Sequence, residues 1–95
     1  MANVKKVIYK VPNGKLLKIF LEDADGKIAS IKITGDFFTH PEENIEKMEK
    51  ALVGAQLDEK NLNEKINEFL NLNPTSFFGL DTESLVKTIL SATRI

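Results

Sequence analysis

Apolar and polar residues alternate with a period of two through residues 4–35, and this pattern constrains the fold more than any other feature of the chain. Successive side chains of a β-strand point to opposite faces, so a strand with one buried face shows this alternation. The pattern therefore predicts a half-buried antiparallel sheet in the first third of the chain. The residues predicted to face the core are Val7, Tyr9, Val11, Leu17, Ile19, Leu21, Ala29, Ile31 and Ile33.

The first predicted turn of this sheet is a three-residue loop at Pro12–Gly14. This loop pairs Tyr9 with Leu17 and keeps the apolar residues of both strands on one face, whereas a slip of one residue would turn one strand over. Pro12 suits the second position of a type I turn, and Gly14 suits a left-handed residue that follows such a turn. We therefore expect a hairpin with this register.

The second predicted turn is Asp23–Gly26, with aspartate at its first position and glycine at its fourth. A three-residue loop here pairs Leu21 with Ala29 and Ile19 with Ile31. Together the two turns predict a three-stranded meander.

The period changes after Gly35 from that of a strand to that of a helix. Pro41 suits a first helical turn. Either His40 caps this helix or Thr39 does, in the latter case with Glu42 completing a capping box.

Two further helices follow, each with a capping residue before it. Asp58 is the predicted N-cap of the second helix, and Asp81 or Thr82 that of the third. Three strands followed by three helices, in the order β-β-β-α-α-α, predict an α+β fold with the helices packed on one face of the sheet.

The length and charge of the chain limit the classes of protein to which it can belong. Its 95 residues suffice for one domain, expected to span residues 1–95. The net charge is −1, from 13 basic and 14 acidic residues, so no broad attraction to nucleic acid is expected. Because no apolar run reaches membrane-spanning length and the first residues do not resemble a signal peptide, we expect a cytoplasmic protein without a membrane partner.

The chain also lacks most of the groups used in catalysis. It has no cysteine and a single histidine, His40, so thiolate catalysis, cysteine-ligated clusters and zinc–thiolate sites are excluded. Phosphate-cradling glycine loops and a nucleophile elbow are missing as well. A lone histidine has no partners to make it a useful base. We therefore expect no catalytic residue and no metal site.

One candidate for protein binding is the corner Gly35-Asp36-Phe37-Phe38, between the last strand and the first helix. Two adjacent phenylalanines cannot both point the same way, so one is expected to fill the core and the other to reach the surface. Asp36 is expected to bond backbone amides at the corner. The alternative is that the corner is purely structural.

A second candidate is the outer face of the predicted sheet, where Ile8, Leu16, Phe20 and Ile28 lie among lysines. Apolar centres ringed by lysine suit a protein interface, although lysine stems also cover such residues. Phe77–Gly79 offers the same choice between a core plug and part of an interface.

These residues belong to a longer resemblance. The chain resembles the C-terminal domains and stand-alone accessory subunits of lipoate–protein ligases through five markers, which cover about half of the chain in order. The later half matches more loosely, through Phe78-Gly79-Leu80 before an acidic helix start. The markers are Gly14-Lys15-Leu16, Gly26-Lys27-Ile28, Ile33-Thr34-Gly35-Asp36-Phe37-Phe38, Pro41-Glu42-Glu43 and Leu52-Val53-Gly54.

This resemblance implies a fold similar to iron–sulfur scaffold proteins and a heterodimer with a large catalytic ligase subunit. That subunit uses ATP, Mg and lipoate to make lipoyl-adenylate, and then transfers the acyl group to a lysine of a carrier protein. The small subunit is needed for the activation step and is expected to bind no cofactor itself. The expected partner-interface residues are Lys15, Leu16, Phe20, Gly35, Asp36, Phe37 and Phe38.

Two other functions remain open at this point. An iron–sulfur-scaffold-like carrier would share the expected fold, but cluster carriage needs the cysteines that this chain lacks. A regulatory module would bind lipoate itself, without a ligase partner. The stoichiometry of the complex, and whether the domain stands alone or belongs to a longer ligase, are also open.

Overall fold

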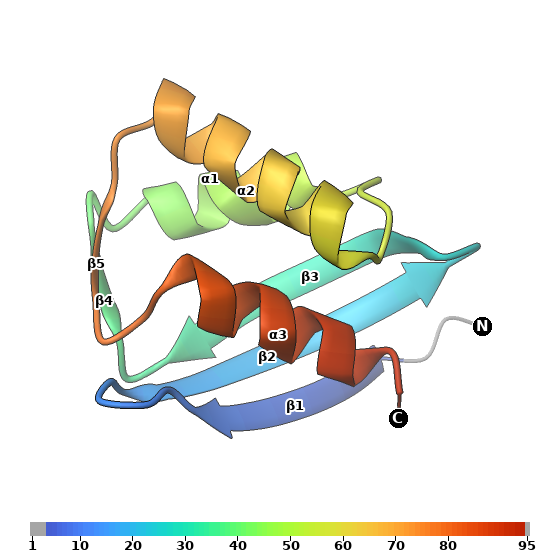
Figure 1. Cartoon of the computed structure of the whole chain (residues 1–95), viewed down its shortest axis with the longest axis horizontal. Coiled ribbons are helices and arrows are strands. Elements are labelled where there is room, and N and C mark those ends of the chain that lie inside the picture. The colour runs from blue at the N-terminus through green and yellow to red at the C-terminus, as the bar shows by residue number, and fades with distance from the viewer. Residues whose placement is uncertain (1–3, 95) are drawn as a thin grey trace.

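The computed structural model describes residues 4–94, which form an antiparallel sheet of order β1-β2-β3 with three helices on one face (Figure 1). The predicted α+β fold is therefore confirmed. A second sheet, made of the short strands β4 and β5, was not predicted. In chain order the elements are β1 (Val4–Lys10), β2 (Leu16–Ala24), β3 (Lys27–Gly35), β4 (Phe38–His40), α1 (Asn44–Leu52), α2 (Glu59–Leu72), β5 (Ser76–Phe78) and α3 (Thr82–Ala92).

The first hairpin has the predicted register, with Tyr9 opposite Leu17. The predicted turn type is wrong. The residue with positive φ is Asn13, at 59°, and the Gly14 N–H donates to the Val11 carbonyl at 2.9 Å, which is the arrangement of a type II turn. Glycine is needed at position 14 for space, because a Cβ there would lie 2.7 Å from the carbonyl oxygen of Gly79.

The second hairpin does not have the predicted register. Asp25 and Gly26 form a two-residue turn with φ of 54° and 74°, as a type I′ turn requires. The register then shifts at Ala29, which has no partner in β2, so that Leu21 lies opposite Ile31 and Ile19 opposite Ile33.

This bulge changes which residues of β3 face the core. One extra residue in a strand reverses the facing of those beyond it, so Ile28 points inward together with Ile31. Ile28 is 1% exposed and Ala29 is exposed, the opposite of the prediction for both.

The first helix begins at Asn44, three residues later than Pro41, and neither Thr39 nor His40 caps it. Thr39 and His40 are paired with β5, so their backbones are extended and cannot enter a helix. Glu43 occupies the cap position without a side-chain bond, so the predicted capping box with Glu42 is also wrong.

The other two helices begin as predicted. The Asp58 carboxylate accepts from the Asn61 N–H at 2.8 Å, and the Asp81 carboxylate accepts from the Ser84 N–H at 2.7 Å. The pKa of the Asp58 carboxyl is held below its ordinary value by hydrogen bonds from Asn61. The bond from the Asn61 backbone N–H has the larger effect, and the bond from its side chain the smaller one.

The core lies between the sheet and the helices. α1 packs on β3, α3 packs on β1 and β2, and α2 packs against both other helices. Within residues 4–94, no helix has the length and apolar character needed to span a membrane. The fully buried large side chains include Leu17, Ile19, Leu21, Ile28, Met48, Leu52, Leu62, Ile66, Leu85 and Ile89.

Candidate functional site

β4 and β5 form a two-stranded ribbon beside the β1–β2 loop end of the large sheet (Figure 1). Phe38 lies directly opposite Phe78 in this ribbon, and their side chains are 68% and 57% exposed. The preceding residue in each case, Phe37 or Phe77, is half-buried and packs against the core. Each Phe-Phe dipeptide therefore places one ring inward and one outward, as predicted for the first of them.

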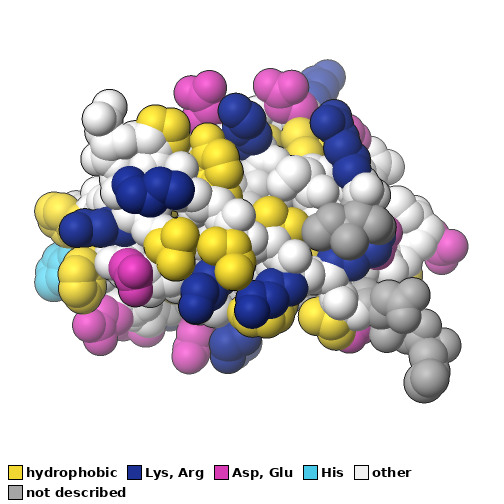
Figure 2. Space-filling view, turned by 90° about the horizontal axis from the view of Figure 1, so that it is seen from below, with side chains coloured by type: hydrophobic (Ala, Val, Ile, Leu, Met, Phe, Trp, Pro, Cys, Tyr) yellow, Lys and Arg dark blue, Asp and Glu magenta, His cyan; other side chains and the backbone are white. Residues whose placement is uncertain are grey.

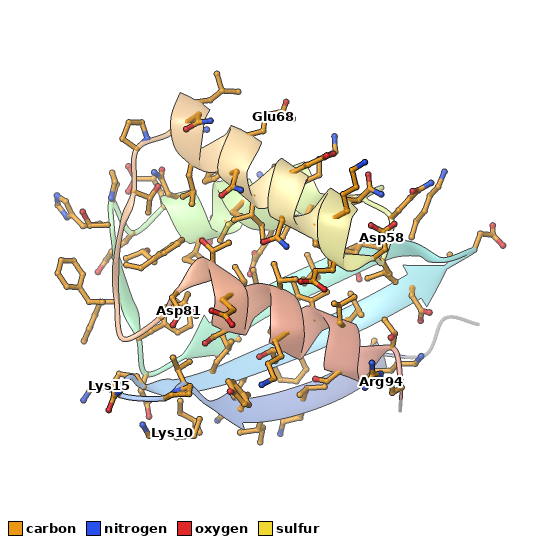
Figure 3. The ribbon with its side chains drawn as sticks, in the orientation of Figure 1. Lys10, Lys15, Asp58, Glu68, Asp81 and Arg94 are labelled. Atoms are coloured by element: carbon orange, nitrogen blue, oxygen red, sulfur yellow. The ribbon has the colours of Figure 1, made fainter. Side chains whose placement is uncertain are left out.

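The β1–β2 loop is hydrogen-bonded to the residue that follows β5. The Lys15 N–H donates to the Gly79 carbonyl at 2.9 Å, and a Cβ at Gly79 would overlap the Lys15 side chain. Lys10 Nζ donates to the Gly14 carbonyl at 2.5 Å, which holds the loop from its other side. Lys10 and Lys15 thus lie together at this end of the sheet (Figure 3).

The corner after β3 meets the same end. Gly35 lies opposite Leu17, and a Cβ on it would overlap the Leu16 carbonyl oxygen, so only glycine fits. The Asp36 N–H donates to that carbonyl at 3.0 Å. Within the described part of the chain, the Asp36 carboxylate makes no such bond, so its predicted bonding to backbone amides is wrong and its backbone N–H fixes the corner instead.

We call the surface made here the tip. It combines residues from three parts of the chain that lie far apart in sequence, with two exposed aromatic rings and one exposed lysine. Aromatic residues are enriched at protein-binding surfaces, so the two exposed rings are the main indication of such a surface here. The tip residues are Lys15, Leu16, Gly35, Asp36, Phe38 and Phe78.

Two of the predicted interface residues lie outside the tip. Phe37 lies beneath it, because its ring packs on the core. Phe20 is on the outer face of the sheet, where Lys6 and Lys32 are its cross-strand neighbours and Lys6 Nζ lies 5.7 Å from its ring centroid. The other five predicted residues are brought together.

The outer face of the sheet mixes apolar and basic side chains (Figure 2). Ile8 is 52% exposed there, whereas Leu16 and Phe20 are half-buried. Ile28 does not belong to this face, because the bulge in β3 turns it into the core. The face is therefore less apolar than the alternation of the sequence predicts.

Phe78 belongs to the tip but is not among the interface residues predicted from the sequence. The sequence predicts either a core residue or part of an interface at Phe77–Gly79, and the structure shows that Phe77 faces inward and Phe78 outward. The available signal was a second Phe-Phe dipeptide, but only the pairing of β4 with β5 shows that the two outward rings are neighbours.

A surface hollow with a volume of about 590 Å³ lies elsewhere, between α2 and α3. Most of its lining residues are polar, among them Asn63, Asn67 and Glu83, although about half of the lining surface is apolar. Small-molecule sites are mostly apolar, so this hollow gives little support to a lipoate-binding module.

Comparisons with known proteins agree with the resemblance seen in the sequence. A family model described as the bacterial lipoate protein ligase C-terminus matches residues 7–89. The fold is similar to a chain in a solved archaeal lipoylation system, a bi-partite lipoate protein ligase and its E2 lipoyl domain from Thermoplasma acidophilum. That similarity has a TM-score of 0.73 and 26% identity, and it covers 94% of each chain. No curated protein matches the chain.

Proposed function

The chain belongs to the bacterial lipoate protein ligase C-terminus family, and from this premise we propose that it is the non-catalytic accessory part of a two-part lipoate–protein ligase. In this role it is needed when the catalytic subunit converts lipoate and ATP to lipoyl-adenylate, before the lipoyl group moves to a carrier-protein lysine. The catalytic subunit supplies the sites for ATP, Mg²⁺ and lipoate.

The observation that carries this proposal is the similarity, along 94% of each chain, to a chain from an archaeal ligase that is itself in two parts. The sequence adds support, because a chain with no cysteine and one histidine has few groups for acyl or nucleotidyl transfer. His40 is exposed in β4. The proposed contribution of this chain is therefore a binding surface.

A physical mechanism follows from the chemistry of acyl-adenylates. Such intermediates are lost to hydrolysis unless water is kept from them, so the catalytic subunit must close around the reactants. A domain that binds the closed state more tightly than the open one raises the population of the closed state by that difference in affinity. The accessory chain then promotes activation without touching the reacting atoms.

The docking surface in this proposal is the tip together with the adjoining outer face that carries Leu16 and Phe20. Phe38 and Phe78 are its expected anchors, because large aromatic rings dominate binding energy when a partner buries them. The Gly35 corner and the bond from Lys15 to Gly79 hold the anchors in place. Truncating Phe38 or Phe20 is therefore expected to weaken complex formation.

The proposal is tested by mixing the chain with a ligase catalytic subunit that lacks this domain. Pyrophosphate release is followed with lipoate present, with lipoate omitted, and with each protein alone. We expect lipoate-dependent release that rises with the amount of accessory chain and saturates. Release at the same rate without the accessory chain would contradict the proposed role.

A further inference from the structure

The two edges of the large sheet differ in how their backbone groups are used. Along β3, the Ile28 N–H donates to the Ala55 carbonyl at 3.0 Å, and the Ile28 carbonyl accepts from the Gly54 N–H at 2.8 Å. The Ile33 N–H donates to the Glu49 carboxylate at 2.6 Å. The segment after α1 and a side chain of α1 therefore cover this edge.

The other edge is β1. In an antiparallel pair, the N–H and C=O of successive residues point to alternate sides of the strand. The Val11 N–H donates to Lys15 in the hairpin at 3.1 Å, so the odd-numbered residues of β1 bond to β2. The even-numbered residues point away from β2, and over residues 4–94 their backbone groups make no hydrogen bond on that side. They are Val4, Lys6, Ile8 and Lys10.

The side chains of these four residues form a regular pattern on the outer face of the sheet. Val4 and Ile8 are 60% and 52% exposed, and the exposed residues Lys6 and Lys10 alternate with them. Figure 2 shows this face, with basic and apolar side chains interspersed. Apolar and basic groups therefore alternate along the same strand that offers free backbone donors and acceptors.

The helix beside β1 adds further positive charge. α3 packs on β1, and Lys87 Nζ lies 5.8 Å from the centroid of the Tyr9 ring. Arg94 is exposed where α3 ends, beside the start of β1 (Figure 3). A chain that lies along this edge thus meets cations on both of its faces.

We propose that the β1 edge binds an extended segment of another protein, which adds to the sheet as a fourth strand and carries acidic residues opposite Lys6 and Lys10. Backbone hydrogen bonds supply affinity in such strand addition, and the side chains supply specificity. Apolar residues of the incoming strand pair with Val4 and Ile8. This inference goes beyond the proposed ligase role and does not depend on it.

A second copy of this chain is not the expected occupant. β1 has three lysines and no acidic residue, so pairing two β1 strands brings no opposite charges together in any register. Lysine on an edge strand disfavours self-association. The same lysines that disfavour pairing of β1 with itself favour an acidic strand.

The test uses the full chain labelled with ¹⁵N and a capped peptide, Glu-Thr-Ile-Thr-Glu-Thr-Val, which places its glutamates opposite the lysines when antiparallel. Amide exchange with solvent is measured by NMR with and without peptide. We expect the amides of Lys6, Ile8 and Lys10 to become protected. The amides of Val7 and Tyr9, already bonded to β2, should change little. Protection elsewhere, or none, overturns the proposal.

Control peptides and variants separate strand addition from general charge attraction. A peptide with lysine in place of glutamate, and an isomer with both glutamates at one end, should bind at least about tenfold more weakly. Ile8→Pro removes an outward N–H without losing a bond to β2 and should abolish protection, whereas Ile8→Thr should retain it. Equal binding by the isomer, or by folded Ile8→Pro, would overturn the proposal.

A charge-reversal variant keeps the proposal falsifiable if Ile8→Pro does not fold. Lys6→Glu should lower the affinity for the glutamate peptide and raise the affinity for the lysine peptide, each by up to about tenfold. Unchanged preference between the two peptides would overturn the assigned pairing. Dimerisation of the wild-type chain through β1 at NMR concentration would also overturn it, because the edge would then accept a strand without acidic residues.

Discussion

Phe37 and Phe77 pack against the core, whereas Phe38 and Phe78, each the next residue in the chain, are exposed at the tip. The four rings have the same chemistry, and each lies in the ribbon or, for Phe37, directly before it, so they differ mainly in the face to which the backbone directs them. The inner pair is expected to contribute to folding and the outer pair to recognition. Alternation along β5 decides which of Phe77 and Phe78 faces inward, whereas Phe37 faces inward from a position just before β4.

The largest effect is expected at Gly35, which stands shortly before one ring of each pair, Phe37 and Phe38. Gly35→Ala should lower the free energy of unfolding by about 3 kcal/mol, because its Cβ would overlap the Leu16 carbonyl at a φ of 148°. Chemical denaturation measures this. Gly26→Ala is the matched control, since it has a positive φ with nothing near the new Cβ, and it should cost about 1 kcal/mol.

Gly35→Ala should also weaken binding to the catalytic subunit, since the corner positions Phe38. If this variant keeps the stability of the wild type, the close approach of Gly35 to the Leu16 carbonyl does not restrict this position to glycine.

The next largest effect is the expected difference in stability between truncating an inward ring and truncating an outward ring. Phe77→Ala should reduce the free energy of unfolding by about 2 kcal/mol, because it removes a half-buried ring from the core. Phe78→Ala should change it by no more than about 0.5 kcal/mol. Urea titrations of both variants, done side by side, measure the difference. Equal losses would show that the outward ring is also part of the packing.

For binding to the catalytic subunit the order should be reversed, because here the outward rings matter more than the inward ones. The double variant Phe38→Ala/Phe78→Ala should lose about 2 kcal/mol of affinity for the catalytic subunit, or about thirtyfold, with its fold intact. Because the rings are direct cross-strand neighbours, the two single variants should not be additive. Calorimetry of all three variants measures this coupling. Leu72→Ala removes an apolar side chain that is 74% exposed on α2, and it should leave affinity unchanged.

The smallest effect concerns the cap of α2, which lies outside the tip. The pKa of Asp58 is lowered in the folded chain, so its charged form stabilises the fold above the unfolded value of 3.8. That contribution is lost as pH falls through the lower folded pKa. The stability of wild type relative to Asp58→Asn should therefore fall between about pH 5 and pH 2. If the difference in stability between wild type and Asp58→Asn stays constant or rises as the pH is lowered, the cap assignment is wrong. The difference in stability between Phe77→Ala and Phe78→Ala should be the same at either end of this pH range.

The first hairpin and the second show how far the sequence predicts the sheet. The alternation of apolar and polar residues before and after Pro12–Gly14 is unbroken, so this alternation alone predicts the correct strand register. In β3 the bulge at Ala29 interrupts the alternation, and phase alone placed Ile28 on the wrong face. The two-residue turn at Asp25 and Gly26 was the local signal for the shorter loop.

The site was predictable in part for a related reason. The Gly35–Phe38 corner and Lys15 lie in one continuous stretch with a family resemblance, and the structure brings them together. The partner of Phe38, in contrast, is 40 residues further along the chain, in a strand of only three residues. Pairing between such short and distant segments leaves almost no periodic pattern in the sequence, so neither β5 nor the place of Phe78 was expected.

In the proposed function, this chain promotes a reaction whose reactive groups belong to another protein. The decisive measurement is the amount of lipoyl-adenylate formed in the first turnover, which is quenched and quantified by mass spectrometry. We expect adenylate when both proteins are present and none with the accessory chain alone. Little should form with the catalytic subunit alone, or when the Phe38→Ala/Phe78→Ala variant replaces the accessory chain at matched concentration. Full adenylate formation by the catalytic subunit alone, or any by the accessory chain alone, would contradict the proposed function.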